Sequence, residues 1–339
     1  MEDIISFEAL YESMQKCKRG VIWKDSVAHF VLNAVEEINK LHSQLEDGTY
    51  KTRKTKVFIV DGAHKREAMG VAFRDRVYQR SLNDNAIYPA MVKSFIYDNG
   101  ACQKNKGTNF SRERLVCFLQ RYYRKHGTKG YVLQCDIKGY YPNMRHDVVE
   151  KTFRKQLPPE IHEMACEVMR GQYSGEVGYL PGSQMIQIAG ISVLNGLDHF
   201  IKERLRIKLY TRYMDDFILI HEDKEYLEKC REEIAKQLEP MGFELHPKKT
   251  RIYPIKEGIK YLGFIYRLTG TGKVVRTVLP KNVKSYRRKL FRLVKLAKKG
   301  KISHEKVDEC YRSWRAHAEK GDSTKLLRRM DAYYRDLWK

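Results

Sequence analysis

The chain has 339 residues, 42% of them hydrophobic, and a formal net charge of +23 at neutral pH. Such a positive surplus is typical of a protein that binds phosphate groups, whether a nucleic-acid enzyme, a ribosomal protein or a membrane-surface protein. The hydrophobic runs are far shorter than a membrane span, and the seven scattered cysteines form no Cys-x-x-Cys pair. These patterns exclude a membrane-spanning protein, a disulfide framework and a zinc site.

The N-terminal third is expected to contain helices and one exposed strand. Residues 6–46 carry apolar side chains at helical spacing and predict two helices, the second with apolar positions from Val27 to Leu41. Residues 52–60 alternate basic and apolar side chains, which predicts an exposed strand. Lys65 and Arg66 follow, and then the mixed segment 73–82 and the lysine-rich segment 102–108.

A short buried strand then ends at an acidic residue. Residues 112–126 predict a helix, and residues 132–137 predict a strand in which Asp136 stands at the end. Residues 138–142 contain a glycine, two tyrosines and a proline, which is typical of a turn. A helical stretch is expected over residues 143–180, interrupted at Pro158 and Pro159, and a long helix over residues 185–209.

Two adjacent acids lie between apolar runs further along the chain. Tyr213, Met214, Asp215 and Asp216 are flanked by β-forming residues, which predicts two strands with the acids at the hairpin tip. If this hairpin neighbours the Asp136 strand, Asp136 and Asp215 can share two Mg²⁺ ions about 4 Å apart, the geometry used in phosphoryl transfer.

The remaining segments predict a helix, a hairpin and a basic helical tail. Residues 224–238 predict a helix with a solvated face, and residues 270–272 a hairpin turn. From residue 281 onward the pattern is helical, with basic side chains between apolar ones, which predicts an amphipathic helix with a basic face. The basic positions at the start of this tail are Arg287, Arg288, Lys289, Arg292, Lys295, Lys298, Lys299 and Lys301.

These segments together resemble the reverse transcriptases. The acid pair matches the family's third palm motif, Tyr-x-Asp-Asp, and Asp136 followed five positions later by Tyr141 matches its first. The segments 73–82, 102–108, 180–187, 241–250 and 261–264 resemble other family motifs in the right order. The resemblance implies an α+β right-hand polymerase: N-terminal helices and fingers over 1–130, a palm with a ferredoxin-like sheet over 131–275, with an insertion at about 143–180, and a helical basic thumb over 276–339.

The resemblance also implies roles for single residues. Asp136, Asp215 and Asp216, together with Ile137, would form the metal site for two Mg²⁺ ions, with Mn²⁺ as a substitute. Lys248 is the candidate proton donor to pyrophosphate, and Lys249 is the competing choice. Tyr141 is the candidate gate that excludes the ribose 2′-hydroxyl, and the residues expected to contact the incoming dNTP are Lys65, Arg66, Arg74, Tyr141 and Gln187.

The second palm motif departs from the usual family pattern. Pro181, Ile186 and Gln187 stand where the family has Gln, Ser and Pro, and the Gln resembles the enzymes of diversity-generating retroelements. An antiphage-defence reverse transcriptase is the alternative. An RNA-dependent RNA polymerase and a non-catalytic RNA-binding protein with a retained palm also stay open, although Tyr141 argues against the first and the intact acids against the second.

The resemblance further indicates the setting in which the protein works. We expect a cytoplasmic protein, bacterial or phage-encoded, that acts on an RNA template and a DNA or RNA primer. A dedicated structured RNA and an accessory protein are the further partners expected, and no membrane is involved. We expect no RNase H, integrase or endonuclease domain after the thumb.

Overall fold

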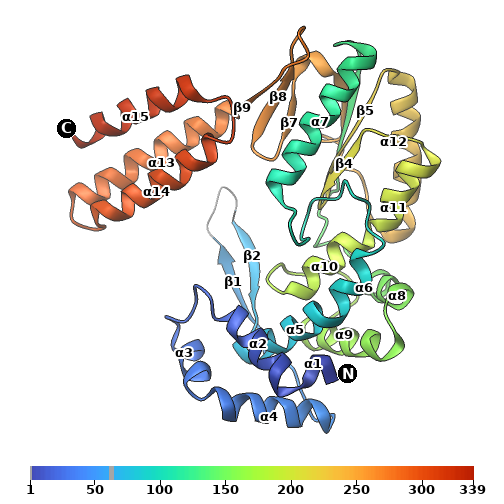
Figure 1. Cartoon of the computed structure of the whole chain (residues 1–339), viewed down its shortest axis with the longest axis vertical. Helices are drawn as coiled ribbons and strands as arrows, with labels where there is room; N and C mark the ends of the chain where they lie inside the picture. The colour runs from blue at the N-terminus through green and yellow to red at the C-terminus, as the bar shows by residue number, and fades with distance from the viewer. Residues whose placement is uncertain (1, 61–64) are drawn as a thin grey trace.

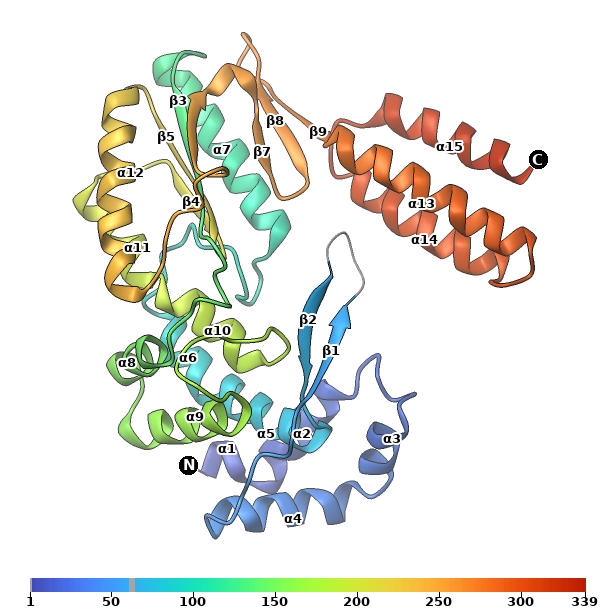
Figure 2. The ribbon, with the colours of Figure 1, turned by 180° about the vertical axis from the view of Figure 1, so that it is seen from behind.

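The computed structural model describes residues 2–60 and 65–339 and shows three groups of elements (Figure 1). N-terminal helices and a long hairpin form one group, a four-stranded sheet with its covering helices forms the second, and a C-terminal bundle of three helices forms the third. Figure 2 shows from behind that the hairpin and the bundle lie on the same side of the sheet. No helix in the described part of the chain is long and apolar enough to cross a bilayer.

Four helices open the chain, where two were predicted. They are α1 (Glu2–Ile5), α2 (Phe7–Cys17), α3 (Asp25–Leu32) and α4 (Ala34–Glu46). The predicted second helix breaks at Asn33, whose side-chain Nδ2 donates a hydrogen bond to the His29 carbonyl oxygen over 3.0 Å. Such a local bond competes with helix continuation, and it leaves Val35 exposed although its spacing predicted burial.

The exposed strand is confirmed and forms half of a projecting hairpin. Strand β1 (Lys56–Val60) pairs antiparallel with β2 (Arg66–Gly70), and all five residues of β1 are exposed. The Met69 N–H of β2 donates to the Pro181 carbonyl oxygen over 2.9 Å. Gly182 permits this contact, since a Cβ there would lie 2.0 Å from the Met69 oxygen. The hairpin is thus hydrogen-bonded to the segment that precedes helix α10 (Gln184–Val193).

A helical layer follows the hairpin. It contains α5 (Phe73–Leu82), the π-helical turn η1 (Asn83–Ile87) and α6 (Tyr88–Val92), and it packs on the N-terminal helices. The predicted helix over residues 112–126 is confirmed as α7 (Thr108–His126), which begins four residues earlier.

The central sheet has the strand order and helix succession of a ferredoxin-like fold. Its strands are β3 (Tyr131–Asp136), β4 (Tyr210–Tyr213), β5 (Asp216–His221) and β6 (Arg251–Pro254), in the antiparallel order β4-β5-β3-β6. Helix α12 (Lys224–Leu238), at its predicted bounds, joins β5 to β6. Because side chains alternate along a strand, Leu133 and Phe217 pack in the core cluster that contains α12, while Val132 and Ile218 pack in the cluster that contains α7.

The connection from β3 to β4 is helical and contains two breaks that the sequence did not predict. Helices α8 (His146–Gln156) and α9 (Pro159–Gln172) are separated at the predicted prolines. The predicted long helix over residues 185–209 is instead α10 (Gln184–Val193), α11 (Asn195–His199) and the π-helical turn η2 (Phe200–Arg204). Leu194 has ψ 4°, which ends α10, and Arg206 has φ 49°, which is incompatible with continuing the helix.

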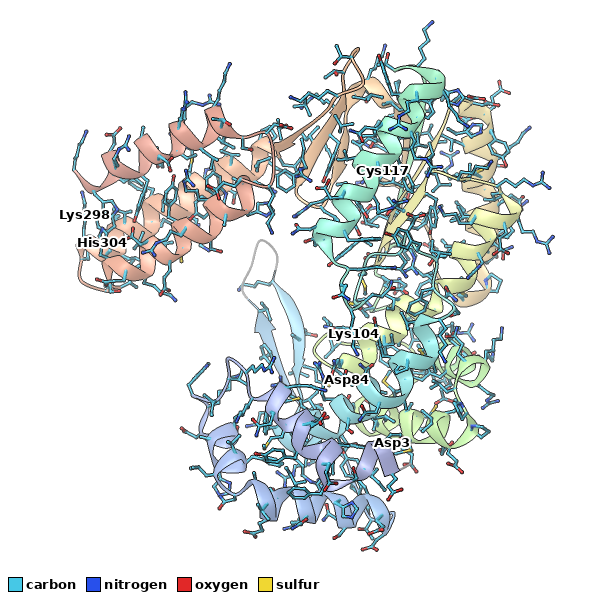
Figure 3. The ribbon with its side chains drawn as sticks, viewed as in Figure 1. Asp3, Asp84, Lys104, Cys117, Lys298 and His304 are labelled. Carbon is cyan, nitrogen blue, oxygen red and sulfur yellow. The ribbon has the colours of Figure 1, made fainter. Side chains whose placement is uncertain are left out.

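The C-terminal part joins a small sheet to the helical bundle. The short 3₁₀ turns η3 (Glu239–Met241) and η4 (Ile255–Glu257) flank β6, and β7 (Ile259–Tyr261), β8 (Phe264–Leu268) and β9 (Val274–Val278) form an antiparallel sheet with the predicted turn between β8 and β9. The bundle consists of α13 (Pro280–Lys298), α14 (His304–Ala318) and α15 (Thr324–Trp338). Lys298 and His304 lie at the end of the bundle remote from the sheet (Figure 3).

Candidate active site

Three carboxylates meet at one end of the central sheet. Asp136 is the last residue of β3 and lies directly opposite Asp216, the first residue of β5. Asp215 lies in the two-residue turn that joins β4 to β5. The predicted hairpin with acids at its tip, next to the Asp136 strand, is therefore confirmed in its strand geometry.

The turn that carries Asp215 is conformationally unusual. Met214 has φ 58°, a left-handed conformation that costs a non-glycine residue about 1 kcal/mol or more. The Arg212 guanidinium supports the turn, because its Nη1 donates to the Met214 carbonyl oxygen over 3.0 Å. This hydrogen bond from Arg212 thus stabilises the strained turn.

Arg212 belongs to a fully buried ion pair. Its Nη2 and Nε contact the two carboxylate oxygens of Asp198 at 2.6 and 2.7 Å, and neither side chain is exposed. Nη2 also donates to the Ile191 carbonyl oxygen of α10, and the Tyr210 hydroxyl donates to Asp198. The network therefore links the acidic turn to both α10 and α11.

Burial and mutual repulsion raise the pKa values of two of the acids. For Asp216, burial is the largest cause, and the charges of Asp136 and Asp215 add to it, so that its pKa rises to about 7 despite a hydrogen bond from Gln134. Burial, followed by the charge of Asp136, raises the pKa of Asp215 as well. The site therefore favours added positive charge.

A lysine supplies one such charge. The Lys249 ammonium lies 3.0 and 3.1 Å from the two carboxylate oxygens of Asp136. Lys248, predicted as the proton donor, is exposed, and its side chain has no ion-pair partner among the described residues. The structure thus brings Lys249, the competing choice, to the acids.

The donor set suits a divalent cation of the hard type. Carboxylate oxygens are the ligands that Mg²⁺ and Mn²⁺ prefer, and burial followed by repulsion between the acids raises the pKa values of Asp215 and Asp216. Within residues 2–60 and 65–339, no three His, Cys, Asp or Glu side chains are already grouped as metal ligands. The residues of the predicted site that would hold such a cation are Asp136, Asp215, Asp216 and Ile137.

Ile137 can contribute to such a site only through its backbone. Its side chain is buried. On one edge of the strand, the His246 N–H donates to the backbone carbonyl oxygen of Asp136, and the Lys138 N–H donates to the carbonyl oxygen of Glu244. In this antiparallel pattern the Ile137 carbonyl is left on the other edge, the side of β5.

The predicted sugar gate lies against the acidic turn. A Cβ on Gly190 of α10 would lie 3.1 Å from the Tyr141 hydroxyl oxygen and 3.3 Å from Met214 Cε. The absence of a side chain at Gly190 therefore lets Tyr141 and Met214 approach α10 closely. Tyr140 is buried and donates its hydroxyl to the Gly190 carbonyl oxygen, in agreement with a core role. Gln187 is exposed one turn before Gly190 and therefore lies on the same side of α10.

The three predicted triphosphate contacts in the fingers differ in position. Lys65 is exposed just before β2, and the Arg66 side chain lies outside the described part of the structure. Arg74 is 7% exposed and hydrogen-bonds Gln44, with its guanidinium over the Tyr50 ring. The prediction for Arg74 is corrected, because its side chain packs between α4 and α5 and is not presented to a nucleotide.

Three residues of the hydrogen-bond network around the acids were not predicted from the sequence. Arg212, Asp198 and Gln134 were not singled out, although Gln134 contacts Asp216 at 3.4 Å and the Lys260 carbonyl oxygen at 2.8 Å. A polar or charged residue inside an apolar strand was the available signal for Gln134 and Arg212. Asp198 carried no such signal, since helices commonly contain acids.

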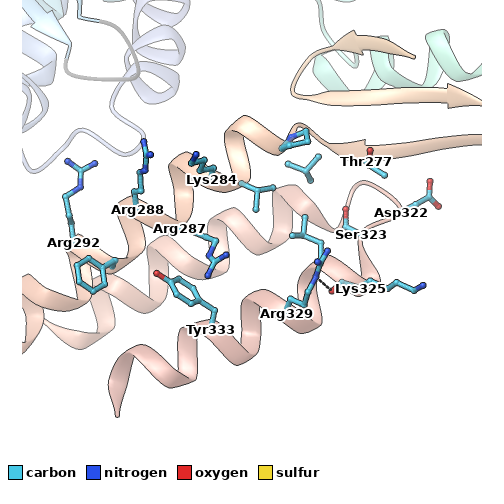
Figure 4. Close-up of a pocket in the computed structure, with 15 residues that line it drawn as sticks. Thr277, Lys284, Arg287, Arg288, Arg292, Asp322, Ser323, Lys325, Arg329 and Tyr333 are labelled. Atoms are coloured by element: carbon cyan, nitrogen blue, oxygen red, sulfur yellow. Dashed lines mark hydrogen bonds between the residues drawn. The ribbon is translucent and has the colours of Figure 1, made fainter. Parts of the chain in front are cut away.

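A basic groove lies on the bundle, separate from the acids (Figure 4). It encloses about 1300 Å³ between α13, α15 and the end of β9. The Arg287 guanidinium lies 4.3 Å from the centre of the Tyr333 ring, and Phe291 is exposed beside it. The basic side chains that line the groove are Lys284, Arg287, Arg288, Arg292, Lys325 and Arg329.

Comparison with known proteins identifies the fold and the family. The sequence matches the family model of reverse transcriptase (RNA-dependent DNA polymerase) over residues 69–266, more than half of the chain. A search of curated proteins finds no match. Among solved structures, a Candida albicans telomerase in complex with a fragment of telomeric RNA is similar, with a TM-score of 0.50 and 12% identity over 73% of this chain and 52% of the telomerase chain.

Other solved structures show weaker similarity. A Candida tropicalis telomerase truncated from its C-terminal domain has a TM-score of 0.48 at 14% identity, covering 73% of this chain and 60% of that one. A Sicinivirus RNA-dependent RNA polymerase has a TM-score of 0.47 at 13% identity, with 72% and 57% covered. This chain thus spans about half to three fifths of the length of these chains.

The molecule has the right-hand fold of template-directed polymerases, as predicted. It belongs to the reverse transcriptase family, the RNA-dependent DNA polymerases. We use palm for the β3–β6 sheet and its helices, fingers for the β1–β2 hairpin with the helices around it, and thumb for α13–α15.

We predict that Asp198→Asn strongly destabilises the protein. The change leaves the Arg212 charge buried without its partner, a loss of about 3–5 kcal/mol in the free energy of unfolding. Urea unfolding of the metal-free protein measures it. Glu233→Gln, which weakens an exposed pair with Lys236, is the matched control and should leave the midpoint unchanged. Equal midpoints for both variants would contradict the role of the buried pair.

We further predict that Asp216 makes stability depend on pH in the absence of metal. Its folded pKa of about 7 exceeds the unfolded value of about 3.9, so the protonated form is favoured by folding, and this stability is lost as pH rises through 7. Asp216→Asn should therefore gain stability relative to wild type between pH 5.5 and 8.5.

Asp147→Asn is the control for this titration. Hydrogen bonds from Arg145 and Lys151 lower the pKa of half-exposed Asp147 to about 2, so Asp147 stays ionised throughout the range. Its stability difference from wild type should be constant from pH 5.5 to 8.5. A constant difference for Asp216→Asn as well would show that Asp216 does not titrate there.

Proposed function

We propose that this protein extends a DNA or RNA primer on an RNA template by two-metal phosphoryl transfer. The observation that carries the proposal is the register that sets Asp136 opposite Asp216 with Asp215 in the adjoining turn. Bound Mg²⁺ or Mn²⁺ would activate the attacking oxygen and neutralise charge on the leaving group. Asp136, Asp215 and Asp216, with the Ile137 carbonyl, are the residues that would hold these ions.

The protein's own groups supply orientation and a proton. Arg212 fixes the turn that carries Asp215, and it does so through a bond made before any substrate binds. The Lys249 ammonium, which lies at the acids in an ion pair with Asp136, would donate a proton to the departing pyrophosphate, the role predicted for Lys248. Tyr141, whose ring lies against Gly190, would exclude a 2′-hydroxyl from the sugar site.

The groove on the thumb supports binding of the template–primer duplex. Its six lysines and arginines face a single acidic neighbour, Asp322, so it presents excess positive charge to phosphate groups. Template RNA, primer and dNTPs are therefore the partners we propose for the active centre, and a dedicated structured RNA and an accessory protein are proposed as further partners.

We propose a diversity-generating retroelement as the biological setting, on the basis of Gln187. This side chain is exposed on the α10 face that carries Gly190, which packs against Tyr141. A flexible amide at this position would discriminate base pairs less strictly than the rigid proline found in most of the family. The alternative setting is antiphage defence, which carries no requirement for mutagenic copying.

Asp136→Asn and Asp215→Asn are each predicted to abolish DNA synthesis while RNA affinity stays within about twofold of wild type. Each change removes charge that stabilises the transition state and leaves the basic thumb untouched. Incorporation of dNTPs on a primed RNA, with Mg²⁺ or Mn²⁺ and with chelator, measures activity. Retention of more than a few per cent of activity by either variant would refute the assignment, and activity of wild type without metal would refute the mechanism.

Tyr141→Ala is predicted to raise ribonucleotide incorporation relative to deoxyribonucleotide incorporation. The change removes the ring beside Gly190 and opens space for the 2′-hydroxyl. The ratio of kcat/KM for rNTP and dNTP on one primed template measures it, and Tyr140→Phe, which only removes a buried hydroxyl, is the control. An unchanged ratio in Tyr141→Ala would show that this ring is not the gate. A wild-type preference for rNTPs would favour an RNA polymerase instead.

Gln187→Pro is predicted to reduce errors opposite template adenines. Shape discrimination of about 1–3 kcal/mol corresponds to a change in error frequency of roughly tenfold to a few hundredfold. Deep sequencing of cDNA from a defined RNA measures the errors. Proline at the fourth residue of α10 also removes a backbone N–H, so Gln187→Ala is the companion variant that keeps this N–H. Wild-type errors spread evenly over all four template bases would favour the defence setting.

A further inference from the structure

A second basic surface lies on the palm, at the end of the sheet remote from the acids. It surrounds two adjoining hollows of about 200 and 570 Å³, which share the side chains of His126 and Glu222. We call it the distal basic surface and define it by its lysines and arginines, Arg121, Lys125, Lys129, Arg206, Lys208 and Lys256.

Strand geometry separates this surface from the catalytic centre. Tyr131 and His221, which line the hollows, are paired at the opposite ends of β3 and β5 from Asp136 and Asp216. Five residue steps along a strand span about 17 Å. In Figure 1 the C-terminal end of α7, which carries part of this surface, lies at the edge of the palm away from the fingers hairpin.

Several segments converge to build the surface, and one of them is held firmly. Arg121 and Lys125 are one turn apart on α7. Arg206 and Lys208 come from the segment before β4, where the Leu205 and Ile207 N–H groups donate to Phe200 and Ile201. The Lys202 ammonium donates to the Lys208 carbonyl oxygen over 3.0 Å, which fixes the segment further.

Within the described structure, the lysines and arginines of this surface outnumber its acids by six to one. Glu222 is the acid lining the two hollows, and it is paired with His126. None of the six lysines and arginines has an ion-pair partner among residues 2–60 and 65–339. The dipole at the end of α7 favours a nearby cation and accounts for Lys125, but Arg206, Lys208 and Lys256 come from other segments.

The chemistry of the surface fits phosphate groups and not an apolar partner. None of the large hydrophobic residues that are exposed on the described structure lines the two hollows. Lysine and arginine side chains around a concave surface suit the backbone of a folded nucleic acid, where phosphates on two strands lie close together.

We propose that the distal basic surface binds the phosphate backbone of a base-paired RNA segment that lies outside the copied template. The proposal rests on the proposed function, because it assigns a second binding surface to the RNA that the enzyme copies. Its role is to hold a structured RNA on the enzyme while the template passes through the active centre some 17 Å away.

Two RNAs that share one template–primer test the proposal. One ends after the template, and the other continues into a hairpin of about 20 base pairs. We expect wild type to bind the hairpin RNA more tightly, and we expect Arg121→Ala/Lys125→Ala and Arg206→Ala/Lys208→Ala each to remove most of this gain, about tenfold. The salt dependence of hairpin binding should weaken by about one unit of slope for each phosphate that a variant no longer neutralises.

Matched controls separate this surface from general charge. Lys229→Ala/Arg231→Ala removes two exposed charges from α12 and should preserve the gain from the hairpin. All variants should bind and extend the short template–primer as wild type does. Failure of wild type to extend the short template–primer would refute the proposed function. The distal basic surface is tested separately, because the gain from the hairpin is measured by binding alone.

Three outcomes would overturn the proposal. The first is an unchanged hairpin gain in both double variants, and the second is an equal loss in the α12 control. The third is that the double variants lose binding to vesicles of anionic phospholipid but keep their binding to hairpin RNA, which would assign the surface to a membrane. Because the two double variants change different segments, misfolding of one leaves the other as the test.

Discussion

The register between β3 and β5 decides where the three acids lie. It sets Asp136 opposite Asp216, and a slip of one residue would turn every side chain of the strand to the other face of the sheet. Asp136 would then face the apolar core under α12, where Leu133 and Phe217 now pack. The pairing of these two strands, which are buried on both faces of the sheet, therefore positions the acids as a consequence of folding.

Holding the acids at this place is costly, and the surrounding structure compensates for the cost. Burial and repulsion disfavour the charged forms of Asp215 and Asp216, and the turn at Met214 is strained. The buried pair of Arg212 and Asp198 offsets the strain through a bond to the turn. Such a pair does not add much net stability compared with an apolar core, but it specifies one arrangement of α10, α11 and the hairpin.

The sequence predicted most of the elements and the place of the acids because those depend on local patterns. Short apolar runs ending in turn residues located β3 and the hairpin, and interspersed charged and apolar residues located α12. The breaks at Asn33 and Leu194 were missed, since each depends on a local backbone conformation within a continuous apolar pattern. Motif position alone could not show that Arg74 points into the fingers core, or that Lys249 contacts Asp136, because both depend on packing between distant segments.

A crystal structure of the protein with a primed RNA template, a non-hydrolysable dNTP analogue and Mn²⁺, analysed by anomalous scattering, shows directly whether the acids hold the metal ions. We expect two manganese peaks beside Asp136 and Asp215, the Ile137 carbonyl oxygen next to one of them, and the Lys249 ammonium displaced from Asp136. Manganese absent from the acids, with the Lys249 pair intact beside a bound nucleotide, would contradict this expectation.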